Sequence, residues 1–226
     1  MDRLRRIGAG VLLAAALCGP ARAQTMLYPD RLPDGYAYVR FVNTGAEPVT
    51  VRPAGFGEAM TLGTEGAARV SSYRVVEGVA GRDLEAQVSA GGRSGRGAFA
   101  VEPGSFDTVL VGPDMALAAV RDEAEVSQTR ARLSFYNAAP GCAAATLQLD
   151  PGGRAVFAGV GPSAMRGRAV NPAAKVRLRA ACSTGQSAAL DLGEIGAGGQ
   201  YSVWLMAPAG KATAFMSVNA IAPYLR

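Results

Sequence analysis

An internal repeat constrains the fold of this 226-residue chain more than any other feature of its sequence. Residues 37–43 (AYVRFVN) resemble residues 131–137 (ARLSFYN) at a shift of 94 residues. Residues 104–113 then match residues 199–208 at a shift of 95. A nearly constant shift over most of a unit indicates a duplicated domain rather than chance similarity between strands.

The hydrophobic pattern inside each unit has a period of two residues. Ala37, Val39 and Phe41 fall on one side of a strand, and the residues between them fall on the other. Clusters of turn residues, such as 91–95 (GGRSG) and 150–153 (DPGG), separate these alternating runs. Short alternating strands with frequent turns are typical of antiparallel sandwiches. We therefore predict an all-β fold of two tandem antiparallel β-sandwich domains joined by a short linker.

The N-terminus predicts export from the cytoplasm. A basic start, an apolar stretch at 7–17 and small residues at 21–23 (ARA) form a signal peptide that would be cut before Gln24. We expect the mature protein in the periplasm. The predicted boundaries are a signal peptide at 1–23, a first sandwich at 24–113, a linker at 114–128 and a second sandwich at 129–226. The linker is alanine-rich and acidic, and one helical turn is expected there.

Two cysteines remain after the predicted cleavage. In an exported chain, Cys142 and Cys182 are expected to form one disulfide bond. The alternative is two free thiols, which an oxidising compartment seldom leaves in such a pair.

The composition argues against an enzyme. The chain has no histidine, which excludes a Ser-His-Asp triad, a Cys-His dyad and histidine-ligated zinc. The glycine cluster at 196–199 precedes a predicted strand and lacks the lysine of a phosphate-binding loop. We therefore predict no catalytic residue, no cofactor and no metal. A Ser-Lys dyad through Lys175 or Lys211 is disfavoured, and paired carboxylates of the glycosidase type stay open.

Positive charge is concentrated in the second half of the chain. Residues 128–226 hold eight arginines and two lysines against three acids, a net charge of +7. Alternation places Lys175, Arg177 and Arg179 on one strand face, which we expect Arg130 and Arg132 to extend. Such a face suits an acidic protein or a uronate-type polymer, whereas an ordinary solvated face is the alternative. Nucleic acid is not an expected partner outside the cytoplasm.

A second candidate surface is apolar. If Val203 and Leu205 face the core, Trp204 and Met206 point away from it and could dock a partner protein. The alternative is that the neighbouring domain or the chain end covers this strand. The complete candidate surface for a partner or polymer comprises Arg130, Arg132, Lys175, Arg177, Arg179, Trp204 and Met206.

The start of the mature chain resembles a known family. Residues 27–28 (LY), 33–40 (PDGYAYVR) and 43–45 (NTG) resemble the beginning of AlgF, a periplasmic protein of alginate O-acetylation. Asn171-Pro172, followed by Val176 and Leu178, resembles a second stretch of that family. The family acts beside a membrane-bound O-acyltransferase and periplasmic acetyltransferases that use a Ser-His-Asp type triad. The resemblance thus implies a non-catalytic adaptor for exopolysaccharide O-acetylation. A carbohydrate-binding module and a two-domain envelope chaperone are the alternatives.

Overall fold

The computed structural model describes residues 34–55, 58–123, 125 and 127–223. The predicted signal peptide and the cleavage site before Gln24 lie outside these residues. Strands dominate the described chain, with two short 3₁₀ turns, η1 (Gly66–Arg69) and η2 (Pro208–Gly210), and no α-helix in this part. No helix in the described ranges is long and apolar enough to cross a membrane. The prediction of an all-β fold is confirmed.

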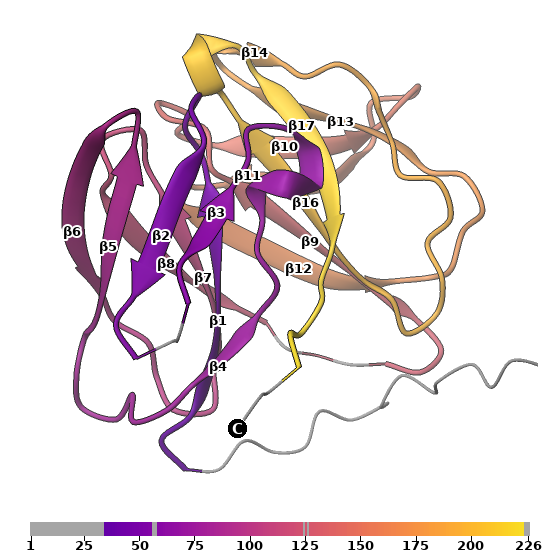
Figure 1. The fold of residues 1–226 in the computed structure, drawn as a ribbon. Helices are drawn as coiled ribbons and strands as arrows, with labels where there is room; N and C mark the ends of the chain where they lie inside the picture. The colour runs from indigo at the N-terminus through magenta and orange to yellow at the C-terminus, as the bar shows by residue number, and fades with distance from the viewer. Residues whose placement is uncertain (1–33, 56–57, 124, 126, 224–226) are drawn as a thin grey trace, which may run out of the picture.

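The strands of the first half form two four-stranded sheets (Figure 1). One sheet has the order β4-β1-β7-β8, with bounds β4 (Arg74–Val76), β1 (Ala37–Asn43), β7 (Phe106–Val111) and β8 (Leu117–Asp122). The other has the order β3-β2-β5-β6, with bounds β3 (Met60–Leu62), β2 (Val49–Pro53), β5 (Leu84–Ala90) and β6 (Arg93–Phe99).

The second half repeats this plan. Its first sheet has the order β12-β9-β16-β17, with bounds β12 (Ala164–Val170), β9 (Ala131–Asn137), β16 (Gln200–Met206) and β17 (Thr213–Val218). Its second sheet has the order β11-β10-β13-β14, with bounds β11 (Ala155–Val160), β10 (Ala145–Leu149), β13 (Arg177–Cys182) and β14 (Gly185–Gln186). A short strand, β15 (Leu190–Asp191), also pairs with β13.

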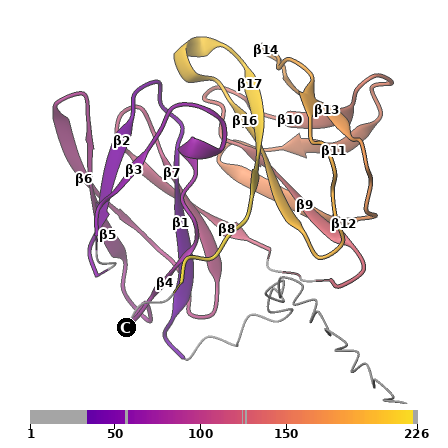
Figure 2. The same ribbon diagram turned by 45° about the vertical axis from the view of Figure 1, so that its right-hand side comes forward.

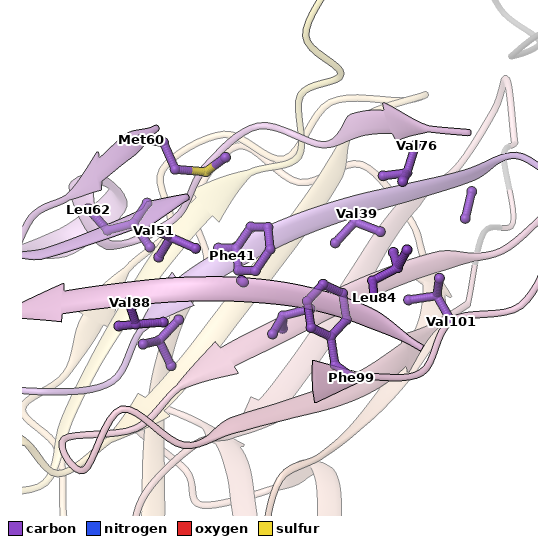
Figure 3. Close-up of a cluster of buried hydrophobic side chains, with 14 of the residues drawn as sticks. Val39, Phe41, Val51, Met60, Leu62, Val76, Leu84, Val88, Phe99 and Val101 are labelled. Atoms are coloured by element: carbon purple, nitrogen blue, oxygen red, sulfur yellow. The ribbon is translucent and has the colours of Figure 1, made fainter. Parts of the chain in front are cut away.

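Each half packs its two sheets around a core of its own. Figure 3 shows Phe41 and Val39 of one sheet facing Val51, Val88 and other buried side chains of the opposite sheet. Strand β5 alternates buried and exposed residues, which is the pattern expected when one face meets the core and the other meets water. The second core likewise joins residues of β9 and β16 to residues of β10 and β13.

The strand registers of the two halves correspond at a shift of 94 in three ladders, those of β1 with β4, β1 with β7 and β2 with β5, and in their counterparts in the second half. Phe41 pairs with Val109 across the parallel strands β1 and β7, and Phe135 pairs with Val203 across β9 and β16. The shift of 95 that the sequence suggested for the last strong strand is therefore wrong by one residue.

The error arose in the turn before this strand. Gly104 and Gly198 occupy equivalent positions, with φ of 77° and 74°, a conformation that glycine adopts without steric cost. The backbone N–H of Gly104 donates to Tyr36 O, and that of Gly198 donates to Arg130 O. Gly199 follows directly, so aligning it with Gly104 moves the match by one position. Trp204 consequently corresponds to Leu110.

The predicted linker also needs correction, because much of it is strand rather than a helical turn. The chain reverses at Gly112, whose N–H donates to Ala116 O, and β8 then pairs antiparallel with β7. Leu117 packs against Gly97 of β6, where a Cβ would come within 2.9 Å of the leucine Cγ. This close approach and the ladder to β7 outweigh the weak strand preference of alanine. Strand β8 therefore completes the first sandwich, as β17 completes the second.

The two sandwiches pack against each other through the sheets that contain β1 and β9 (Figure 2). A third apolar cluster fills this contact and comprises Val42, Leu110, Val120, Tyr136, Ala138, Trp204 and Met206. All seven residues of β1 and all seven of β9 are buried. Trp204 and Met206 are 0% exposed, so they are not a docking stripe. The neighbouring sandwich covers them, as the alternative interpretation held.

The C-terminal segment ties the second half back to the first. After β17, the chain continues beside Tyr73, whose backbone N–H donates to Ala220 O at 2.8 Å. The N–H of Ala222 donates in turn to Tyr73 O at 2.8 Å. Figure 1 shows this yellow end of the chain running toward β4.

Candidate functional site

A buried arginine lies at the centre of the contact between the sandwiches. Arg40 of β1 is 1% exposed. Its Nε donates to Thr108 Oγ1 at 2.8 Å, and its Nη1 donates to Asn219 Oδ1 at 2.8 Å. Its Nη2 donates to Tyr136 Oη at 2.8 Å and to Ser202 Oγ at 3.1 Å. Alternation correctly places Arg40 on the face of β1 away from its own core, but this face meets the second sandwich and not water.

Asp122 of β8 balances this charge without touching it directly. Its carboxylate accepts hydrogen bonds from the hydroxyls of Tyr73, Thr108 and Tyr136, each at 2.6 Å. The Thr108 and Tyr136 hydroxyls each accept from Arg40 and donate to Asp122. Two shared hydroxyls therefore link the cation to the anion, which satisfies both groups in a buried setting where an unpaired charge is costly. We call Arg40, Asp122, Tyr73, Thr108, Tyr136, Ser202 and Asn219 the polar junction.

Aromatic rings enclose the guanidinium. Its Cζ lies 4.5 Å from the centre of the Tyr73 ring, 5.0 Å from that of Trp204 and 5.4 Å from that of Tyr136. The Tyr136 and Trp204 rings stack with their centres 4.0 Å apart, and Trp204 Nε1 donates to Ser217 Oγ at 2.9 Å. Desolvated contacts between an arginine and ring faces add to the hydrogen bonds of the junction.

Burial shapes the acid–base behaviour of the junction. It raises the pKa of both Tyr73 and Tyr136; Arg40 lowers these values and Asp122 raises them. Burial alone would lower the pKa of Arg40, but Tyr136, Tyr73 and Asp122 together bring the net pKa above its ordinary value. The junction therefore holds a charged arginine and two neutral phenols. This arrangement links the two sandwiches, and every buried side-chain N and O atom of the junction has at least one hydrogen-bond partner.

The raised phenol pKa values predict a loss of stability at high pH. A tyrosine in the unfolded chain releases its proton near pH 10, whereas Tyr73 and Tyr136 in the folded protein keep theirs. The stabilisation is complete below pH 10, and it declines above that pH by up to about 1.4 kcal/mol per pH unit for each phenol. Urea unfolding between pH 9 and pH 11.5 measures this slope. It should become shallower in the Tyr73→Phe/Tyr136→Phe variant, and an unchanged slope in that variant would contradict the assignment.

The described residues that carry the AlgF resemblance serve this architecture. Arg40 anchors the junction, and Asn43 fixes the loop after β1. Asn43 Nδ2 donates to Glu47 O and Gly63 O at 2.8 Å each, while its Oδ1 accepts from the N–H of Gly45 at 2.9 Å. Asn137 makes the equivalent set of bonds in the second sandwich. Arg40 and Asn43, the two motif side chains with these bonds, therefore serve the fold.

The arginines of the predicted basic face lie in two different sheets of the second sandwich. Arg130 and Arg132 flank or belong to β9 in one sheet, while Arg177 and Arg179 belong to β13 in the opposite sheet. Alternation shows the side of a strand on which a residue lies, but it does not show which sheet the strand joins. The expected continuous face is therefore wrong. Lys175 is exposed and precedes β13.

Most of these arginines also have partners. Arg132 is 6% exposed and forms ion pairs with Glu123 and Glu125. Arg177 and Arg179 share one carboxylate, that of Asp150, at 3.6 and 3.0 Å. Arg130 is exposed, and its Nη2 donates to Ala169 O at 2.8 Å. Of the candidate basic surface, only Lys175 and Arg130 are thus exposed cations without a carboxylate partner among the described residues.

The predicted disulfide bond is confirmed. Cys142 and Cys182 are bonded, with their Cα atoms 5.8 Å apart. The bond joins the loop between β9 and β10 to the end of β13 within the second sandwich.

Metal-binding clusters and surface pockets are other features of the described residues that could carry chemistry. No group of three histidine, cysteine, aspartate or glutamate residues in the described ranges is arranged to hold a metal ion. An open pocket at one end of the first sandwich is lined by Glu47, Arg93, Met115 and several neighbours. Its two charged side chains pair with each other at 3.5 Å, so they neutralise each other there.

Comparison with known proteins adds little to this description. No family model and no curated protein matches the chain. Two similar solved structures are each described as a "putative cell adhesion protein". One is from Bacteroides uniformis ATCC 8492 and has 9% identity and a TM-score of 0.26, with 81% of this chain and 97% of that chain covered. The other is from Bacteroides ovatus ATCC 8483 and has 9% identity and a TM-score of 0.26, with coverage of 85% and 100%. Likeness at this level carries no argument about function.

Proposed function

We propose that this protein is a non-catalytic periplasmic adaptor for the O-acetylation of an exopolysaccharide, either alginate or a related polymer. In this role it docks the acetyltransferase proteins of the periplasm and membrane, and it could also contact an anionic polysaccharide. The observation that carries the proposal is the AlgF-like motif at residues 33–40 and 43–45. Its described part supplies Arg40 to the polar junction and Asn43 to the loop after β1, so the resemblance includes two residues that stabilise the architecture.

The chemistry of the side chains supports an accessory role. The transferases of such systems use a histidine-containing triad, and this chain has no histidine. A partner protein must therefore supply that step. Two sandwiches linked by the polar junction suit an adaptor, because a rigid protein holds two partners at a fixed separation.

Trp204 weighs against the alternative of a carbohydrate-binding module. Such modules use exposed aromatic rings to stack on sugars, and the only tryptophan of the sequence is fully buried. It stacks on Tyr136 instead.

Two measurements test the adaptor proposal. Deleting the gene should abolish acetylation of the secreted polymer, and re-expression of the intact protein should restore it. Purified protein mixed with an acetyl donor and the polymer should show no turnover by itself. Acetyl transfer by this chain alone would refute the non-catalytic role, and a polymer that stays fully acetylated in the deletion strain would refute the adaptor role.

A further inference from the structure

The second sandwich contains a long segment without acids. Between Asp150 and Asp191 the chain has six cationic residues and no aspartate or glutamate. These cations are Arg154, Arg166, Arg168, Lys175, Arg177 and Arg179. Asp150 pairs with Arg177 and Arg179. The remaining four have no carboxylate partner in the described part of the chain.

Two of these arginines lie along an open edge of the sandwich. β11 and β12 are edge strands of opposite sheets. Arg166 Nη1 of β12 donates to Ala158 O of β11 at 3.1 Å, and Arg168 Nη1 donates to Val156 O at 3.4 Å. Both side chains are exposed. Because they are two residues apart on one strand, their Cα atoms are about 7 Å apart.

The backbone bonds orient these guanidinium groups and leave most of their donors free. A guanidinium carries five N–H donors, and each of these arginines uses one of them on β11. The other donors can bind a carboxylate through two parallel hydrogen bonds. Arg154 directly precedes β11, and Arg130 is held at the end of β12 by its bond to Ala169 O. The β11–β12 edge therefore presents a row of two oriented cations, Arg166 and Arg168, and Arg154 and Arg130 lie beyond its Arg168 end.

The first sandwich supplies an internal comparison. Its edge strand β6 also carries two exposed arginines, but Arg93 lies 3.5 Å from Glu47 and Arg96 lies 3.7 Å from Glu85. Acids offset the cations on that edge. On the β11–β12 edge the corresponding acids are missing, and closely spaced like charges without a counter-charge repel each other.

We propose that the β11–β12 edge binds the carboxylates of an acidic polysaccharide of the uronate type, with Arg166 and Arg168 as its central contacts. The choice of this polymer rests on the proposed function, whereas the site rests on the arginines. Protein interfaces centre on large apolar and aromatic side chains. The exposed large hydrophobic residues of the described chain are Leu149, Val218 and Ile221, and only Leu149 lies near this edge. A hydrophilic polyanion therefore fits the edge better than a protein does.

Binding of a uronate oligosaccharide prepared from alginate to the purified mature protein tests the site. Arg166→Ser/Arg168→Ser should weaken binding about tenfold or more, because it removes two hydrogen-bonding charges from the contact. The control Arg93→Ser/Arg96→Ser makes the same change in net charge and should alter the dissociation constant less than about twofold, because acids already offset those arginines. Wild-type binding should weaken between 0.1 and 1 M salt, as the Debye length falls from about 10 to about 3 Å.

Two further probes separate the possible ligands. A neutral oligosaccharide of matched length should not bind, and a poly-glutamate peptide should bind more weakly than the uronate. Arg166→Lys/Arg168→Lys should give intermediate affinity, because lysine keeps the charge but lacks the planar guanidinium that binds a carboxylate through two hydrogen bonds. Equal losses in the two serine variants, tighter binding of the peptide, or no uronate binding at low salt would each overturn the site.

The failure of this inference is distinguishable from failure of the adaptor proposal. If Arg166→Ser/Arg168→Ser protein restores acetylation in the deletion strain and wild type does not bind uronate, the adaptor role stands and the polymer site is wrong. If uronate binding is lost as expected but deletion leaves acetylation unchanged, the site stands and the adaptor role is wrong.

Discussion

Arg40→Met should lower the free energy of unfolding by about 3–5 kcal/mol, the range expected when one member of a buried charge pair is removed. The carboxylate of Asp122 would remain buried with no cation near it, and Asn219 and Ser202 would each lose a donor. Methionine keeps much of the volume of the side chain, so the loss reports mainly on charge and hydrogen bonds. Urea unfolding followed by the fluorescence of Trp204, which lies against the same guanidinium, measures the change directly.

Two variants serve as controls for Arg40→Met. Arg52 of β2 is exposed, and Arg52→Met should change the free energy of unfolding by less than about 0.5 kcal/mol. Arg40→Lys should fall between wild type and Arg40→Met, because an ammonium keeps the charge but cannot reproduce four hydrogen bonds in the plane of a guanidinium. A loss below about 1 kcal/mol in Arg40→Met would mean that the polar junction contributes little to the contact between the sandwiches.

Removing the disulfide bond should have an effect of similar size. The bond closes a loop with a sequence separation of 40 residues, and the chain-entropy model gives about 4 kcal/mol for a loop of that length. Cys142→Ala/Cys182→Ala should therefore lower the free energy of unfolding by that amount, measured by urea denaturation of the oxidised protein. Adding a reductant should destabilise the wild type and leave the double variant unchanged. Two thiols that alkylate readily in the native wild-type protein would contradict the bond.

Sequence patterns predicted the local structure better than the packing of the two halves. Alternation and turn clusters identified the sandwiches, and the expectation of an oxidising compartment identified the bond between Cys142 and Cys182. Alternation also put Arg40 on the outer face of its strand. It could not show that a second sandwich covers that face. The neighbouring residues on that face carried a signal that it is covered, because Tyr38 and Val42 are largely apolar.

Strand β8 was missed for a related reason. Its sequence, LAAVRD, has no strong alternation, and its acid looked like part of a solvated linker. In the folded chain Asp122 is instead a buried acceptor that balances Arg40 across two hydroxyls. The arginine that it balances is 82 positions away in the sequence, and the pattern around either residue alone does not reveal the other.

Sequence patterns were limited in the same way for the candidate surface. The count of charges correctly located the basic half, but it did not distinguish arginines with acidic partners from arginines without them. Arg132 binds glutamates from the segment just before its own strand, a proximity that the sequence already contained. The position of Arg166 and Arg168 across the β11–β12 edge required the three-dimensional pairing of two sheets.

Scanning calorimetry tests most directly whether the polar junction makes the two sandwiches one body. Wild-type protein should unfold in a single cooperative transition, with a calorimetric enthalpy equal to the van't Hoff enthalpy. Arg40→Met should unfold at a lower temperature, and its transition should broaden or divide as the sandwiches begin to unfold separately. Two resolved transitions in the wild type, at temperatures that Arg40→Met does not change, would contradict a fastened junction.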